Sequence, residues 1–324
     1  MRRRLFSFAL LAAASLLARA AHTQEPEGGG AAFLLVPVGG RSTALGQAAV
    51  ADGGSSESAY WNPAGLALLA NSELAIHFAK TFASNNTALS GYVQARRLGV
   101  IGISAYLVDF GTQEVAIGPG LPVGRLSPKN IQLLASYAAA LPAGFAAGIS
   151  YKLIQFRQDC SGACGGFPTA VGTTHGIDVG VQYTIAAISG LRVGVAVQHV
   201  GFKLQVRNRD QADPLPTRVQ VGAAYRLLLP EFPSVPERIS ARALVDLRSR
   251  WGTYKHPDVK VGLELAYGDQ FQLRTGYAFL QGEAAGPAIG VGFRIGSVIL
   301  DLGRAFFLSS NFDEPVYVSL RAGL

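Results

Sequence analysis

The stretch VKVGLELAYGDQFQLRTGYAF, residues 259–279, alternates apolar and polar positions in two runs separated by Gly268-Asp269. Apolar residues stand at every second position from Val259 to Tyr267, and threonine, tyrosine and apolar residues do so from Phe271 to Phe279. This alternation predicts two strands with one apolar face each, and the glycine–aspartate pair predicts a tight turn between them. Glycine and charged residues dominate the opposite faces.

Comparable runs recur along the chain and predict about fourteen strands. We place them near 73–80, 87–95, 98–108, 130–141, 143–156, 174–184, 190–200, 217–228, 237–248, 258–267, 270–280, 286–295, 297–305 and 315–324. Short turns at Arg96–Arg97, Pro142-Ala143, Gly268-Asp269 and Gly296 alternate with longer connections near 109–129, 157–173, 201–216, 249–257 and 306–314. An even strand number with alternating connection lengths is typical of membrane barrels. We assign Thr112–Ile117 to an external loop, with a further strand as the alternative.

The composition agrees with a membrane protein that has no membrane helix. Of 324 residues, 49% are hydrophobic, only 15% are charged and 39 are glycine, whereas about a quarter of an average soluble domain is charged. The longest uncharged run after the N-terminus, residues 131–151, is interrupted by the turn sequence Leu141-Pro142-Ala143-Gly144. We therefore predict an all-β protein, a transmembrane antiparallel β-barrel. A secreted soluble β-sandwich is the alternative.

The first twenty residues predict export. Three arginines, Arg2–Arg4, precede a short apolar run from Leu5 to Leu17 and the small-x-small sequence Ala18-Arg19-Ala20, the pattern of a signal peptide. The run is too short to cross a bilayer as a helical anchor. The formal net charge is +7, but removing four arginines from the 28 basic residues leaves 24 against 21 acidic ones, a net charge of +3. We exclude nucleic acid as a partner and predict an integral protein of the outer membrane, in contact with its lipid.

Residues 21–72 do not alternate and contain VPVGGRSTALGQAAVADG (36–53) and SAYWNPAGLALL (58–69). This region resembles the N-terminal region of PorV/PorQ-like outer-membrane proteins, which belong with the FadL-type long-chain fatty-acid transporter barrels. The matching residues are Gly39, Gly40, Arg41, Gly46, Asn62, Pro63, Ala64, Gly65 and Leu66. The resemblance implies that residues 21–72 form a hatch inside the barrel (73–324), with short helices near Ser42–Ala49 and Pro63–Leu69. A disordered linker is the alternative.

The inward faces of the predicted strands carry charges of both signs. They are Asp178, Arg192, Arg218, Arg226, Arg242, Asp246, Lys260, Glu264, Arg274, Arg294 and Asp301. Because buried charges persist when they are paired, we favour a salt-bridge network that holds the hatch to the wall. A polar conduit, or a site for an anionic head group, is the alternative. Glycines on the same faces, such as Gly262 and Gly290, would leave room for the hatch.

The sequence contains no hydrolase, metalloprotease, phosphate-binding or dinucleotide-binding motif. We expect no enzymatic activity, no cofactor and no metal site. Cys160 and Cys164, in a predicted external loop of an exported protein, are expected to form a disulfide.

The resemblance implies one function and leaves a second open. PorV-like proteins assist the export or surface attachment of cargo proteins, with type IX secretion machinery as partner. The alternative is a FadL-type transporter that admits hydrophobic small molecules, such as fatty acids, through a lateral opening.

Overall fold

The computed structural model describes residues 31–95, 98–116, 122–206, 212–227, 229, 238–280, 285–307 and 313–324. The predicted signal peptide and the predicted turn at Arg96–Arg97 lie outside the described residues. The strands are β1 (Glu73–Lys80), β2 (Asn85–Ala95), β3 (Gly99–Asp109), β4 (Gln113–Val115), β5 (Gly124–Ala140), β6 (Phe145–Gly162), β7 (Ala170–Thr184), β8 (Leu191–Gly201), β9 (Arg218–Leu227), β10 (Ile239–Arg250), β11 (Thr253–Tyr267), β12 (Phe271–Phe279), β13 (Gly286–Ile295), β14 (Val298–Ala305) and β15 (Val316–Gly323).

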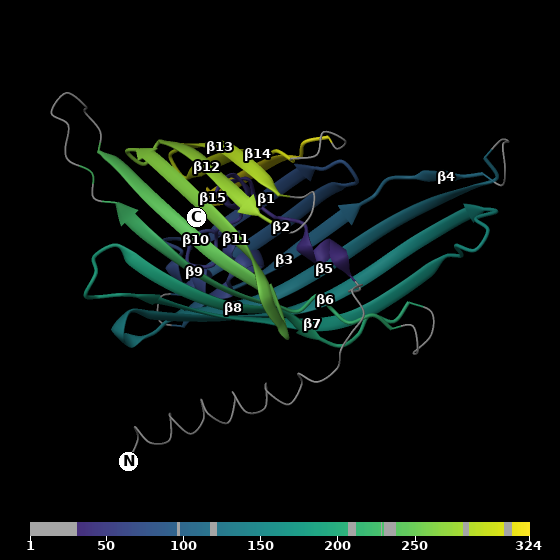
Figure 1. The fold of residues 1–324 in the computed structure, drawn as a ribbon, viewed down its shortest axis with the longest axis horizontal. Helices are drawn as coiled ribbons and strands as arrows, with labels where there is room; N and C mark the ends of the chain where they lie inside the picture. Colours follow the sequence, from purple (N-terminus) through teal and green to yellow (C-terminus); the bar gives the residue numbers. More distant parts are fainter. Residues whose placement is uncertain are drawn as a thin grey trace, which may run out of the picture.

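These strands form a closed antiparallel barrel (Figure 1). Apart from β4, the strands pair in sequence order: β3 pairs directly with β5, and β15 returns to pair with β1. The ring therefore has 14 strands, and β4 pairs only with the far end of β5. The predicted fold class is confirmed.

The structure corrects the prediction at the connections. Thr112–Ile117 was expected to be loop, but Gln113–Val115 form β4. Strands β5, β6 and β7 run well into the expected loops 109–129 and 157–173 and project beyond the barrel (Figure 1). The expected connection 249–257 is a tight turn at Trp251-Gly252, because β10 continues to Arg250 past a register shift. Both faces of the β6 extension are at least partly exposed, so its sequence carries no apolar alternation.

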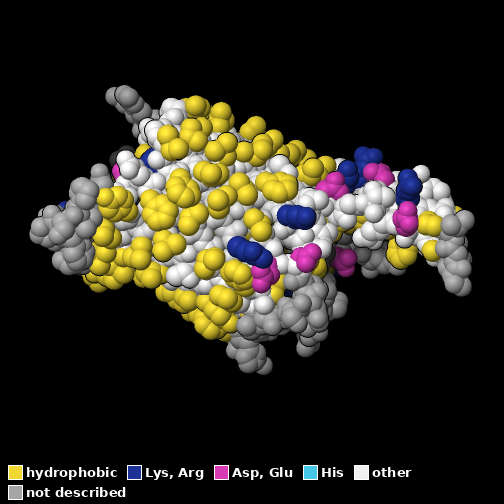
Figure 2. All heavy atoms as spheres, turned by 90° about the horizontal axis from the view of Figure 1, so that it is seen from above, with side chains coloured by type: hydrophobic (Ala, Val, Ile, Leu, Met, Phe, Trp, Pro, Cys, Tyr) yellow, Lys and Arg dark blue, Asp and Glu magenta, His cyan; other side chains and the backbone are white. Residues whose placement is uncertain are grey.

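The outer face of the barrel is apolar. On β1, Leu74, Ile76 and Phe78 are 52%, 42% and 44% exposed, whereas the residues between them are buried. Hydrophobic side chains cover much of the wall seen in Figure 2, and charged side chains gather toward its narrow projecting end. The outward face thus suits lipid. Among the described residues, no helix is long and apolar enough to span a membrane.

The helices are short and lie mostly before the barrel. They are η1 (Ala32–Leu35), α2 (Gly40–Ala44), α3 (Ser58–Trp61), η2 (Pro63–Leu68) and η3 (Pro142–Gly144). The helix expected at Ser42–Ala49 is wrong in its bounds: α2 ends at Ala44, and Gly46 and Gln47 follow with φ angles of 62° and 65°. Such left-handed residues end a helix. The second helix, expected near Pro63–Leu69, is η2.

We call residues 31–72 the N-terminal segment. Its helix α2 contacts β12, β13, β14 and β15, and η2 contacts β5, β6 and β7 on the opposite side of the barrel. Glycines permit the close approach, since a Cβ on Gly262 would lie 2.6 Å from the Leu45 carbonyl oxygen, and one on Gly290 would lie 2.5 Å from the Ala44 Cβ. The segment therefore lies across the lumen. That it acts as a hatch stays a prediction.

Candidate functional site

The matched NPAGL residues build the part of the N-terminal segment that faces β6 and β7. Asn62 is fully buried, and its side-chain oxygen accepts from the backbone nitrogen of Ala64 at 3.1 Å, which caps η2 with Pro63 at its first position. Its amide nitrogen donates to the Val50 carbonyl at 2.7 Å. A side chain at Gly148 or Gly180 would collide with Pro63 or Asn62. Ala64, Gly65 and Leu66 are buried in η2.

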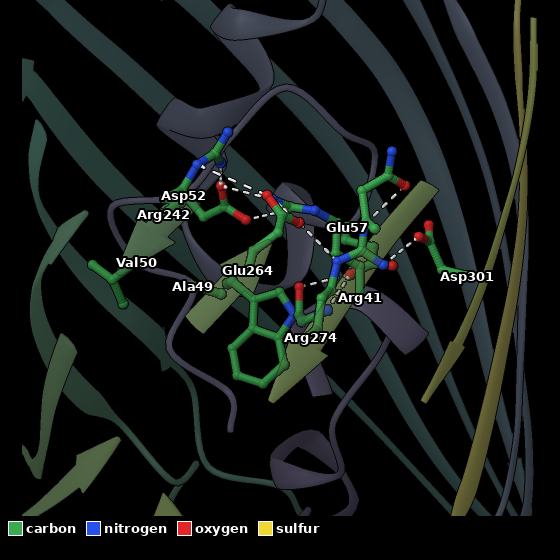
Figure 3. Close-up of polar contacts among 12 residues, drawn as sticks. Arg41, Ala49, Val50, Asp52, Glu57, Arg242, Glu264, Arg274 and Asp301 are labelled. Carbon is green, nitrogen blue, oxygen red and sulfur yellow. Dashed lines mark hydrogen bonds and ion pairs between the residues drawn. The ribbon is translucent and has the colours of Figure 1, made fainter. Parts of the chain in front are cut away.

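A chain of buried ion pairs joins the N-terminal segment to the wall (Figure 3). Arg41 pairs with Asp52 within the segment and reaches Glu264 of β11 at 3.3 Å. Arg242 of β10 reaches the same Asp52 at 2.7 Å. Burial lowers the pKa of the Arg41 guanidinium, while Glu264 opposes this shift. Charges from the segment and from the wall therefore neutralise each other out of water.

The chain of ion pairs continues around the wall from β11 to β1 and passes over β13. Arg274 of β12 contacts Glu264 at 2.7 Å and Asp301 of β14 at 2.6 Å, and Asp301 also accepts from Arg321 of β15 at 2.8 Å. Arg321 reaches Glu73 of β1 at 3.3 Å. The network thus spans one side of the lumen from β10 to β1.

Glu57, in the turn before α3, accepts hydrogen bonds from the start of α2. Its carboxylate accepts from the Ser42 backbone nitrogen at 2.9 Å and the Ser42 hydroxyl at 2.6 Å. Ser319 of β15 donates to the same carboxylate at 3.3 Å and accepts from the Gly40 nitrogen at 2.8 Å. Gly39, with a φ angle of 96°, leaves no room for a side chain beside Glu57. A side chain at Gly46 would likewise collide with the backbone of Tyr277.

Other predicted inward charges lie in the lumen outside this network. Asp246 accepts from the backbone nitrogens of Ala49 and Val50 at 2.7 and 2.9 Å. Lys260 lies 5.2 Å from the centre of the Trp61 ring. Asp178 pairs with Lys152, and Arg218 lies 3.7 Å from Asp258.

The prediction that all of these charged residues lie enclosed in the lumen is wrong for three of them. Arg294 is exposed at the end of the barrel that carries the Gly296 turn, Arg226 is exposed, and Arg192 is half-buried. Each lies close to the end of its strand, where inward-facing residues meet solvent.

Several network members were missed by the sequence reasoning. Arg321 and Glu73 lie on the inward faces of β15 and β1, so the alternation of those strands could have identified them. Asp52 and Glu57 belong to a segment without periodicity, and no sequence signal identifies their partners.

Cys160 and Cys164 form a disulfide at the outer end of the β6–β7 hairpin, far along the projection from the network. Within the described ranges, no group of three or more His, Cys, Asp or Glu side chains is placed to hold a metal.

An apolar cavity of about 380 Å³ opens inside the barrel at the end that carries the longer connections. Phe33 and Val36 of the N-terminal segment, Phe110 and Phe306 of the connections, and the inward residues Ala288 and Tyr317 line it. Arg248 is the single charged residue in its lining among the described residues. A cavity of this size and polarity is suited to a small hydrophobic molecule. We call it the outer cavity.

The barrel wall has a second apolar hollow, on its lipid-facing side. This outer groove, of about 850 Å³, crosses β15, β1, β2, β3, β5 and β6. Gly91, Ala105 and Ala135 form its floor, and larger residues such as Leu74 and Leu133 form its sides. Behind the floor, the lumen face carries Ser90, Ser104, Ser136 and Ser150, joined by hydrogen bonds to each other or through Tyr92. Small side chains therefore occur on both faces of this part of the wall, between larger ones such as Leu133 outside and Leu134 inside.

No protein-family model matches the chain, and no curated protein matches it. Solved structures do match. The monoaromatic hydrocarbon channel CymD aligns with a TM-score of 0.61 and 13% identity, over 90% of this chain and 98% of that one. The toluene transporter TodX of Pseudomonas putida aligns with a TM-score of 0.59 and 12% identity, over 87% and 97%.

A FadL homologue of Pseudomonas aeruginosa aligns with a TM-score of 0.54 and 12% identity, over 89% of this chain and 99% of that one. At these identities the likeness concerns the fold. The comparisons give no support to the PorV/PorQ part of the resemblance. The chain has the fold of the FadL-type transport barrels.

Proposed function

We propose that this chain is a non-enzymatic outer-membrane barrel that carries small hydrophobic molecules. The outer cavity is the observation that carries the proposal. It lies inside the lumen, it is lined mostly by apolar and aromatic side chains, and the N-terminal segment forms its inner boundary. An apolar ligand would gain roughly 25 cal/mol for each Å² of apolar surface removed from water. The transport activities named for TodX and CymD support the same reading.

The outer groove is the proposed exit. A hydrophobic molecule that reached the lumen behind β2, β3 and β5 would meet the small residues Ser90, Ser104 and Ser136, which lie between larger inward side chains such as Tyr92 and Leu134. On the other side of the wall lies an apolar hollow that faces lipid. Release into the bilayer avoids the charged network, whose desolvated ions would oppose the passage of an apolar molecule toward the other end.

The protein-export role rests on the resemblance of residues 36–69 alone, and the structural neighbours favour transport instead. A strain that lacks this protein distinguishes the two hypotheses. If the protein is a transporter, the strain should display its surface proteins normally but lose uptake of hydrophobic compounds.

Uptake by the purified barrel in lipid vesicles tests the proposal directly. Ala288 and Ile289 are adjacent on β13, but Ala288 is 3% exposed in the outer cavity and Ile289 is 50% exposed on the lipid face. Ala288→Phe should therefore reduce uptake of toluene several-fold, whereas Ile289→Phe should leave it unchanged. Equal uptake by wild type, both variants and protein-free vesicles would refute the proposal.

A further inference from the structure

A second, smaller cavity lies deeper in the lumen than the outer cavity. This inner cavity has a volume of about 30 Å³ and is enclosed by the N-terminal segment and the inward faces of β5, β6, β8, β9 and β10. It shares Leu35, Val36, Pro37 and Arg248 with the lining of the outer cavity. The two cavities are therefore neighbours, separated by that piece of chain.

The described charged residues that line the inner cavity are Lys152, Arg218 and Arg248, all cations. The side chain of Lys152 is 1% exposed, that of Arg248 is 11% and that of Arg218 is 20%. His199 also lines it, and its Nδ1 lies 3.0 Å from the Lys152 ammonium, so this nitrogen accepts the hydrogen bond. The cavity is thus surrounded by positive charge and by the amides of three glutamines.

The carboxylates behind these cations do not balance them. Asp178 neutralises Lys152. Asp258 accepts from Arg248 through Nε at 3.0 Å and Nη2 at 2.8 Å, and Arg218 shares the same carboxylate at 3.7 Å. Asp246 and Lys260 stand opposite each other on β10 and β11, and the Lys260 Nζ is a further buried donor without a hydrogen-bond partner among the described residues. Among the described residues, Arg218 and Arg248 therefore share the single carboxylate of Asp258, and a buried charge that is not compensated is costly.

The same place holds a hydrogen-bond donor without an acceptor. The Nε of Arg218, which lines the inner cavity, is buried and has no hydrogen-bond partner among the described residues. A buried polar group left without a partner costs about 1–3 kcal/mol. Water could satisfy this donor, but it would not compensate the positive charge.

We propose that the inner cavity binds one small monovalent anion, held between Arg218 and Arg248. The volume accommodates about two water-sized groups, which suits a halide or a single carboxylate group. The negative charge has two sources: a dissolved anion, or the acidic head of a ligand whose apolar part lies in the neighbouring outer cavity.

Crystals of the full barrel grown in sodium bromide test the site without any substitution. The expected result is an anomalous bromide peak within hydrogen-bond distance of Arg218 and Arg248. Adding octanoate or octanol to the bromide crystals distinguishes the two sources of negative charge. If octanoate displaces bromide and octanol does not, the site binds the head group of a ligand. If bromide stays in place with both compounds, the site binds a dissolved anion. Absence of both bromide and octanoate from Arg218 overturns the proposal.

Thermal unfolding gives a second readout. At equal ionic strength, the melting temperature should be higher in bromide than in gluconate, which is too large for the cavity, because a bound ligand stabilises the folded state. Arg218→Gln should abolish this difference. Arg304→Gln, an exposed arginine paired with Glu314, should retain it. An unchanged bromide effect in Arg218→Gln contradicts the proposal, and if that variant does not fold, the bromide peak in wild-type crystals decides.

Discussion

Asp301 shows how single residues hold the lumen together. It is fully buried and accepts hydrogen bonds from Arg274 and Arg321, two cations whose other carboxylate partners are Glu264 and Glu73. Asp301→Asn keeps the shape of the side chain and removes its charge. Removing one partner of a buried ion pair costs about 3–5 kcal/mol. We expect a loss of that order in the unfolding free energy of the refolded barrel, measured in urea.

Glu314→Gln is the matched control for that variant. Glu314 forms an exposed pair with Arg304, and such pairs contribute about 0–1 kcal/mol. A loss in Asp301→Asn no larger than in Glu314→Gln would show that the lumen charges are solvated rather than buried.

Gly290 tests the close contact between the wall and α2. A Cβ there would lie 2.5 Å from the Ala44 Cβ of α2 and 2.4 Å from the Leu302 carbonyl oxygen of β14, whereas a Cβ on the lipid-facing Gly91 would meet only the tip of Leu74 at 3.2 Å. Gly290→Ala should cost about 1–3 kcal/mol, the usual cost of overpacking. Gly91→Ala should cost less. Equal melting temperatures for the two variants would contradict the placement of α2 against β13.

At the scale of elements, the N-terminal segment is expected to restrict the lumen. Arg41→Gln with Asp52→Asn removes the segment charges that pair with Glu264 and Arg242 of the wall, while keeping the net charge of the chain. Loosening α2 in this way should raise the single-channel conductance in planar bilayers several-fold. Arg157→Gln with Asp159→Asn, an exposed Arg–Asp pair on β6, should leave the conductance unchanged. Equal conductance in both double variants would show that the ion pairs do not hold the segment in place.

The ring strands were predictable where one face meets lipid and the other faces the lumen. β1, Glu73–Lys80, matches its predicted range, because its apolar residues stand at every second position. The outer parts of β5, β6 and β7 were not predictable, because residues such as Arg125 and Asp159 lie above the apolar band with both faces near water. Hydrogen bonding between neighbouring strands forms these parts without any apolar pattern.

At the scale of the whole molecule, the candidate site was less predictable than the fold. Inward charges such as Glu264 and Asp301 could be placed by strand alternation, but their pairing depends on which strands are adjacent in the closed ring. The outer cavity combines Phe33, Phe110 and Tyr317, which are distant in sequence and share no motif. Such a cavity exists only once the barrel has closed around the N-terminal segment.

The central claim is that a small hydrophobic molecule binds in the outer cavity. Soaking crystals of the barrel with 4-bromotoluene and locating the bromine by anomalous diffraction tests it most directly. We predict a peak inside the outer cavity, among Phe33, Phe110 and Tyr317. Bromine found only on the lipid-facing wall, with none in the outer cavity, would contradict the claim.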